Sequence, residues 1–314
     1  MRQGAARSDY LEWLAQATAA TQGFDPLPDG DVVVGYATGY DAADIAPFVT
    51  SLRAVFDGPV ALVADADPDL RAFLARHAVT AVDAPVWRGW APHPVMQRFV
   101  AFAGLLGERP GGTLACDVRD VIFQAPPLDP APQGLEVFVE ADRPLADHAF
   151  NMKYLRALFG EAQARRLADS QCLCVGTLVG PRAEVSRLSR LILALAATPR
   201  SEIGGAFGAD QAAFNLAIHQ GLIGATVRGN YGRVATLGLT PGDRLRFEGG
   251  QVVNPDASVS PIVHQHDRHP HLDAPVHARW GAGLEHRKRV RPKSLGQKLG
   301  RLKASLRRRT PELR

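Results

Sequence analysis

The sequence lacks any long run of uncharged apolar residues. No stretch of about 18 such residues occurs, which is the length that a membrane-spanning helix needs. The first thirty residues also lack the continuous apolar segment of a signal peptide. We therefore expect no helical membrane span, and the cytoplasm is the expected compartment.

Cysteine is scarce, with Cys116, Cys172 and Cys174 as the three examples. An odd number does not fit a fully paired disulfide framework, and the chain carries no other sign of export. We interpret the three thiols as reduced core residues rather than as a redox pair or metal ligands.

The composition is that of a globular protein with an uneven distribution of charge. The 314 residues are 46% hydrophobic and 22% charged, which suffices for one large core or two smaller ones. Residues 285–314 hold twelve Lys and Arg against two acidic residues, a net charge of +10, whereas the remainder has 24 basic and 30 acidic residues, a net charge of −6. We expect one domain over 1–284 and a basic tail over 285–314.

Apolar periodicity along the chain alternates between strand-like and helix-like segments. Strands are predicted at 31–38, 60–64, 79–82, 111–116, 136–140 and 172–179, and helices at 8–22, 44–56, 68–77, 95–106, 183–197 and 210–220. Repeated strand–helix–strand units predict an α/β fold, in which helices flank a mixed, mostly parallel sheet.

A polar cluster follows the strand predicted at 111–116. It contains Asp117, Arg119 and Asp120, and the ligands of open α/β sheets bind at the carboxyl ends of strands. Two carboxylates beside a buried strand need a cation or hydrogen-bond donors nearby, so a metal, an arginine or a ligand is expected. Because Arg119 could supply the charge itself, an internal salt-bridge cluster is the alternative.

Two further polar segments occur later in the chain. Residues 264–271 contain four His, one Asp and one Arg, side-chain types that bind metals and phosphates, although their spacing fits no structural zinc site. A solvated polar loop is the alternative. The glycine-bearing loop 205–209 leads to Asp210 and Gln211 at a helix start, where Asp210 could instead be an N-cap.

Together, the segment from Asp117 to Gln124, the Asp210-Gln211 pair and the segment from His264 to Pro270 resemble a group of GT-A glycosyltransferases distantly similar to the glycogenin-like transferases. The resemblance covers roughly residues 31–272. It implies a Rossmann-like GT-A fold and hexosyltransferase-like transfer from a nucleoside diphosphate sugar, usually a UDP-sugar. The resemblance favours retention of configuration, but inversion stays open because the outcome depends on where Asp210 lies relative to the sugar. The expected acceptor is a glycan or a lipid-linked molecule in the synthesis of bacterial cell-surface polysaccharide.

The resemblance also implies roles for particular residues. Asp117, Asp120 and His264 would bind Mn²⁺ or Mg²⁺ on the donor diphosphate, and Asp210 and Gln211 would be catalytic. The residues implied in donor binding are Tyr36, Thr38, Tyr40, Arg98, Arg119, Gly176, Thr177 and Arg268. Because Arg119 stands where the family has a second Asp, either Asp120 replaces that ligand or Arg119 pairs with the diphosphate itself.

The basic tail has the pattern of an amphipathic helix. Within 287–309, the leucines at 295, 299, 302 and 306 fall on one helical stripe flanked by Lys and Arg. This pattern suits an anionic membrane surface, so we expect peripheral association with the inner face of the cell membrane. A solvated disordered tail is the alternative, and nucleic acid is disfavoured because no aromatic residues are interleaved to stack on bases.

Two other classes of function remain open. A nucleotidyltransferase acting on a sugar phosphate would be expected to carry a Lys- or Arg-bearing phosphate loop after the first strand, but residues 35–41 contain neither. A non-catalytic module that binds membranes or nucleic acid would need only the tail. Such a module would leave the polar cluster around Asp117 unexplained.

Overall fold

A computed structural model describes residues 8–285. The helix predicted within 287–309, and with it the expected membrane contact, lies outside the described residues. Among the residues that are described, no helix has the length and apolarity needed to cross a bilayer.

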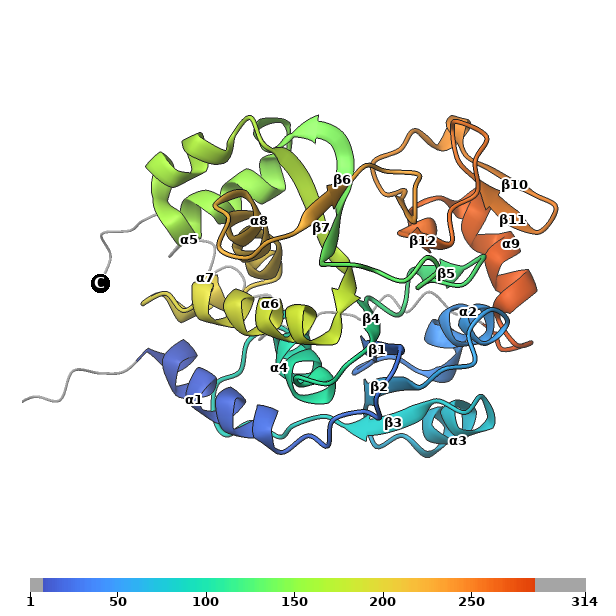
Figure 1. The fold of residues 1–314 in the computed structure, drawn as a ribbon, viewed down its shortest axis with the longest axis horizontal. Coiled ribbons are helices and arrows are strands. Elements are labelled where there is room, and N and C mark those ends of the chain that lie inside the picture. Colours follow the sequence, from blue (N-terminus) through green and yellow to red (C-terminus); the bar gives the residue numbers. More distant parts are fainter. Residues whose placement is uncertain (1–7, 286–314) are drawn as a thin grey trace, which may run out of the picture.

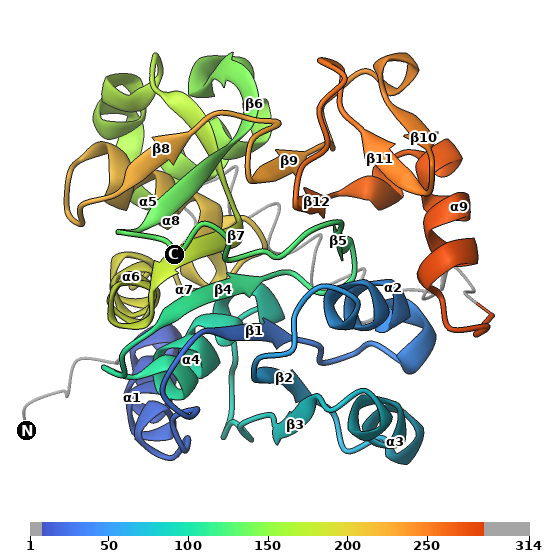
Figure 2. The ribbon, with the colours of Figure 1, turned by 45° about the vertical axis from the view of Figure 1, so that its right-hand side comes forward.

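The main sheet of the described chain has seven strands in the order β3-β2-β1-β4-β7-β6-β8 (Figure 1, with β8 labelled in Figure 2). Its strands are β1 (Val32–Tyr36), β2 (Val60–Ala64), β3 (Thr80–Asp83), β4 (Gly112–Cys116), β6 (Glu136–Pro144), β7 (Gln171–Pro181) and β8 (Thr226–Arg228). β7 runs antiparallel to both of its neighbours, while the other pairs are parallel. The predicted α/β fold with a mostly parallel mixed sheet is therefore confirmed.

Helices cover both faces of this sheet, and strand alternation divides β1 between two cores. Val32, Val34 and Tyr36 join one core and Val33 the other. The first core is packed by α1 (Asp9–Gln22), α4 (Pro94–Leu106), α6 (Arg182–Leu195) and α8 (Ala209–His219), and the second by α2 (Ala42–Arg53) and α3 (Pro68–Arg76) (Figure 2). α5 (Ala149–Leu167) and the short α7 (Ser201–Gly204) lie beside α8.

A small sheet that joins a segment after β4 to the C-terminal part of the described chain was not predicted from the sequence. It has the order β5-β12-β9, formed by β5 (Val121–Phe123), β12 (Ile262–His264) and β9 (Val234–Thr236). A hairpin of β10 (Arg246–Glu248) and β11 (Gln251–Val253) and the helix α9 (Pro270–Trp280) pack beside it. The Thr50 hydroxyl donates to the carbonyl oxygen of Trp280 at 2.5 Å, which joins α9 to α2 (Figure 2).

Candidate functional site

A cavity of about 410 Å³ opens where β1 and β4 end and the small sheet begins. Most of the site residues proposed from the sequence line it: Tyr36, Tyr40, Arg98, Asp117, Arg119, Asp120, Gly176, Asp210, Gln211, His264 and Arg268. Residues that are far apart in the sequence thus converge at the edge of the sheet where ligands of α/β proteins bind.

The small sheet brings Asp120 and His264 together. β5 starts directly after Asp120, and its first residue, Val121, pairs with His264 of β12. The chain then turns at Gln265, whose φ of 64° is in the left-handed region and whose backbone N–H donates to the Asp120 carbonyl at 2.8 Å. Asp117, which follows β4, is held by a backbone hydrogen bond to Gly176 of β7 at 2.8 Å.

Asp117, Asp120 and His264 form a group that could hold a metal ion. Their ligand atoms lie within 4.8 Å of one another, with His264 Nε2 at 3.5 Å from an Asp117 oxygen and 3.7 Å from an Asp120 oxygen. That nitrogen is buried and has no hydrogen-bond partner among residues 8–285. A Cβ added at Gly176 would lie 2.7 Å from Asp117 Oδ2 and 2.8 Å from His264 Nε2, so the glycine keeps the space between the ligands open.

Arg98 of α4 links this group to Asp210 of α8. Its guanidinium, which is 4% exposed, donates to Asp117 through Nη1 and to Asp210 through Nη2, the latter at 2.8 Å. The N-cap of α8 is Gly208 rather than Asp210, and the Asp210 side chain instead forms the ion pair with Arg98. The N-cap alternative for Asp210 was therefore wrong.

The charges in the cavity shift one another's pKa values. Burial by itself raises the pKa of Asp117, but Arg98 and His264 outweigh it and hold that pKa below its ordinary value. Burial raises the pKa of Asp120 and that of Asp210 despite nearby cations. Burial lowers the pKa of His264, yet Cys174 and the two aspartates raise it well above its ordinary value.

Two arginines border the cavity beyond the aspartates. Arg119 Nη2 lies 2.9 Å from an oxygen of Asp267, and Arg268 Nε lies 3.8 Å from the other oxygen of the same carboxylate. Both arginine side chains remain partly exposed, at 40% and 53%. One carboxylate thus holds two guanidinium groups at the cavity, where they are available to an anionic ligand.

The remaining predicted residues differ in their access to the cavity. Tyr36 and Tyr40 line it, and burial raises the pKa of Tyr36 to about 12. Thr38 does not line the cavity, and the Tyr36 hydroxyl donates to Gln97 Oε1 at 3.1 Å. Thr177 is fully buried, because strand alternation turns it away from the face on which Gly176 meets the metal ligands.

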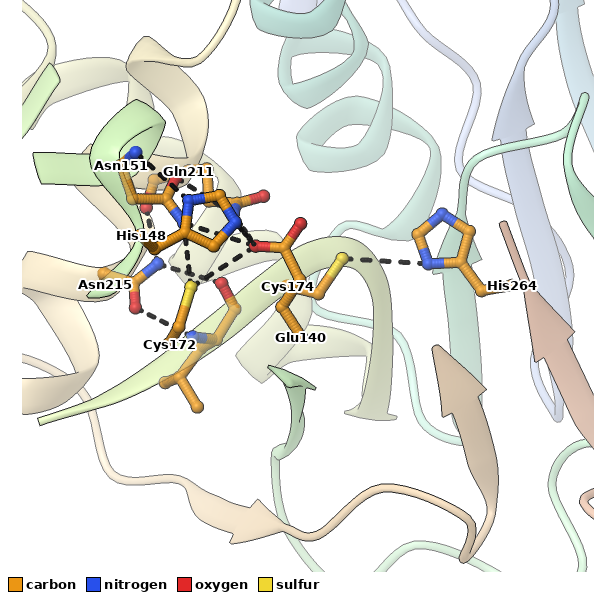
Figure 3. A network of polar contacts seen from close by, with 9 residues as sticks. Glu140, His148, Asn151, Cys172, Cys174, Gln211, Asn215 and His264 are labelled. Carbon is orange, nitrogen blue, oxygen red and sulfur yellow. Dashed lines mark hydrogen bonds and ion pairs between the residues drawn. The ribbon is translucent and has the colours of Figure 1, made fainter. Parts of the chain in front are cut away.

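A second polar network, which was not predicted, forms another wall of the cavity around Glu140 (Figure 3). Its carboxylate Oε2 accepts hydrogen bonds from Gln211 at 2.5 Å, Asn151 at 3.2 Å and the Cys172 thiol at 3.3 Å. His148 Nε2 lies 3.5 Å from the same oxygen. Gln211 is therefore held in place by Glu140.

Glu140, His148 and Cys172 are the second group within residues 8–285 that could hold a metal ion. Here the carboxylate oxygen already accepts several hydrogen bonds, whereas His264 Nε2 makes no hydrogen bond within residues 8–285 and has only the carboxylates of Asp117 and Asp120 as ion-pair neighbours. Asp117, Asp120 and His264 are therefore the better of the two candidate metal-binding groups. The sequence did contain a pattern that could have identified Glu140. This carboxylate directly follows the apolar run 137–139 of a strand, in the same way that Asp117 directly follows β4.

All three cysteines are buried and free, as the sequence predicted. Two of them nevertheless contact polar groups. Cys172 belongs to the Glu140 network, and Cys174 lines the cavity with its Sγ 3.7 Å from His264 Nδ1 (Figure 3). Burial raises the pKa of both thiols.

A scan of the sequence against protein-family models finds no match, and a search of curated proteins finds none at a significant level.

Proposed function

We propose that the chain is a GT-A glycosyltransferase that moves a sugar from a nucleoside diphosphate sugar, in the first instance a UDP-sugar, to a hydroxyl of a glycan or lipid-linked acceptor. One observation carries the proposal. A metal-ligand group of Asp117, Asp120 and His264 shares a single cavity with Arg98, Arg119 and Arg268 at the carboxyl edge of the sheet.

The donor diphosphate would lie between the metal-ligand group and the two outer arginines. Carboxylate and imidazole ligands suit Mn²⁺, and Mg²⁺ would rely more on the two carboxylates. An ion at these residues would offset the negative charge that develops on the leaving nucleoside diphosphate. Arg119 and Arg268 would bind the phosphate oxygens through paired N–H donors.

The other cavity residues would orient the donor. Tyr36 and Tyr40 provide aromatic side chains for the nucleoside at the end of β1. Asp210 and Gln211 lie on the side of Arg98 away from the metal group, where the transferred sugar and its acceptor would meet. Arg98 holds Asp210 in place, and Glu140 holds Gln211, so both side chains are fixed before a ligand arrives.

The loop after β1 favours this function over nucleotidyl transfer. The backbone N–H of Gly39 donates to the Asp65 carboxylate at 2.7 Å, and Asp41 caps α2 by accepting from the backbone of Asp44 at 3.0 Å. A phosphate-binding loop would leave such N–H groups free for the ligand. Carboxylates at this position would repel phosphate instead.

Calorimetric titration of the full chain with UDP, with and without Mn²⁺, tests the proposal. We expect UDP to bind more tightly with Mn²⁺ and Asp117→Ala to abolish the Mn²⁺-dependent part. Asp29→Ala is the control, since Asp29 lies in an exposed ion pair with Arg109. Binding of neither UDP nor another nucleoside diphosphate would refute the proposal, and release of free sugar from a UDP-sugar would extend it to catalysis.

A further inference from the structure

Two phenylalanines at the cavity expose unusually large apolar surfaces. Phe207, in the loop before α8, is 54% exposed, and Phe150, in the first turn of α5, is 39% exposed. Both line the same cavity as Asp210, and so does Leu239, which is 36% exposed. Exposed apolar side chains that gather at a polar cavity are typical of a ligand-binding surface rather than of random surface variation.

The local structure holds these rings in place. The Phe150 and Phe207 ring centroids lie 5.9 Å apart, and His93, at the start of α4, contacts Phe207 edge-on at 5.3 Å. Phe150 also packs on Tyr154 at 5.0 Å. These contacts connect α4, α5 and the loop before α8, so the rings form one supported surface and not two independent side chains.

Gly208 is needed for this arrangement. Its φ of 100° is left-handed, and a Cβ added there would lie 2.7 Å from the Phe150 ring and 2.8 Å from the Tyr154 ring. The glycine therefore lets the loop pack directly against the aromatic side chains of α5. Two residues later the same chain carries Asp210, which is paired with Arg98. The rings are thus fixed relative to the carboxylate nearest to the proposed reaction centre.

Polar groups border the rings on the cavity side. His148, Gln211 and Asp210 line the cavity together with Phe150 and Phe207. A sugar ring has matching chemistry, because one face presents C–H groups while its edge presents hydroxyls. A lipid chain would instead require a continuous apolar groove, whereas the lining of this cavity also includes the polar side chains of His148, Asp210 and Gln211.

We propose that Phe150 and Phe207 form the acceptor platform of the enzyme, on which a sugar ring of a glycan stacks while its hydroxyls face His148, Gln211 and Asp210. The inference rests on the proposed function. It narrows the acceptor class from a glycan or a lipid-linked molecule to a glycan whose sugar ring contacts the platform. The donor would occupy the opposite part of the cavity, with its nucleoside at Tyr40 and its diphosphate between the metal-ligand group and Arg119.

An array of immobilised oligosaccharides, probed with the full chain in the presence of UDP and Mn²⁺, tests the platform. We expect the wild type to be retained on a subset of the glycans. Phe207→Ala should weaken that retention by about tenfold, as expected for the loss of one stacked ring. Phe207→Trp should preserve retention, and Phe207→Leu should weaken it because leucine keeps apolar volume but lacks a flat face.

Leu222→Ala is a matched control, since Leu222 is 51% exposed and does not line the cavity. UDP affinity of each variant, measured by calorimetry, should equal that of the wild type. Failure of the wild type to be retained on any glycan, or retention of Phe207→Ala equal to that of the wild type, would overturn the platform. Retention that Phe207→Leu preserves would indicate general apolar contact and would also overturn it.

The two proposals fail in different ways. If the wild type binds no nucleoside diphosphate but its glycan retention depends on Phe207, the platform stands and the transferase proposal fails. If UDP binds with Mn²⁺ and glycan retention is absent, the transferase proposal stands and the platform fails.

Discussion

Arg98 Nη2 and Asp210 Oδ2 lie 2.8 Å apart, although the two residues are 112 positions apart in the sequence. The other end of the same guanidinium donates to Asp117. One buried cation therefore connects α4, α8 and the end of β4, and it separates the metal-ligand group from the proposed acceptor side of the cavity.

Replacement of Arg98 should destabilise the protein strongly. Arg98→Met keeps much of the side-chain volume but leaves the buried carboxylate of Asp210 without its cation, which costs about 3–5 kcal/mol of unfolding free energy. Urea unfolding followed by circular dichroism measures the loss. Arg109→Met is the control, because Arg109 and Asp29 form an exposed pair whose removal costs about 0–1 kcal/mol. Equal effects of the two substitutions would contradict the proposed importance of burial.

The raised pKa of Asp210 predicts a pH-dependent difference between the wild type and Asp210→Asn. Burial raises this pKa above 3.8, so between 3.8 and the raised pKa the folded protein binds the proton that the unfolded chain has lost. The contribution of Asp210 to unfolding free energy is thus largest at acid pH and falls as pH rises through the raised pKa. Urea titrations at several pH values should show that the unfolding free energy of the wild type falls relative to that of Asp210→Asn as pH rises over that range. A constant difference between the two proteins would contradict the shift.

Local patterns were sufficient to predict six of the seven strands of the main sheet, all but β8, and the helices α1, α2, α3, α4, α6 and α8, but not the elements around them. Gly160, with a φ of 82°, interrupts the helical geometry of α5 and breaks its apolar periodicity. Pro275 lies inside α9, in a region rich in polar residues. β5, β9 and β12 have three residues each, too few to show an alternating pattern. These elements are formed through packing between distant segments.

In the site, too, local patterns identified individual residues but not the contacts between distant segments. Asp117 and Asp120 were identifiable because carboxylates directly follow a buried strand, and the later histidines because they are dense in the sequence. Their proximity in space could not be predicted, because it depends on the strand register that places His264 opposite Val121. Phe150 and Phe207 gave no local signal, because an exposed phenylalanine has the same sequence pattern as a buried one.

Filling the space at Gly176 should remove metal binding without changing a ligand. The added Cβ of Gly176→Ala would crowd Asp117 Oδ2 and His264 Nε2. In the wild type, Mn²⁺ at 100 times its dissociation constant should raise the unfolding free energy by about 2.7 kcal/mol. Thermal melts with and without Mn²⁺ should show this stabilisation in the wild type but not in Gly176→Ala. Glu140→Gln should retain it, and loss of the effect in Glu140→Gln alone would assign the ion to the second group.

Thiol accessibility provides an independent test of the structure. All three cysteines are buried, and burial raises the pKa of each, so little reactive thiolate forms in the native protein. A chromogenic disulfide reagent at pH 8 should therefore titrate less than one thiol in the native chain and about three in denaturant. Rapid native reaction of Cys174 in particular would show that the cavity is more open than described.

The position of Arg119 predicts how the diphosphate is held. Its side chain pairs with Asp267 at 2.9 Å and faces the cavity, where it could bind phosphate with or without a metal. Arg119→Gln should weaken UDP binding by about 10- to 150-fold even with a metal chelator present, since a charge-assisted contact contributes about 1.5–3 kcal/mol. Asp120→Asn should lose the part of the affinity that Mn²⁺ adds. Arg228→Gln is the matched control, because Arg228 pairs with Glu136 at 2.8 Å and lies outside the cavity. If Arg119→Gln binds UDP as tightly as the control does, the diphosphate is held by the metal-ligand group and not by this arginine.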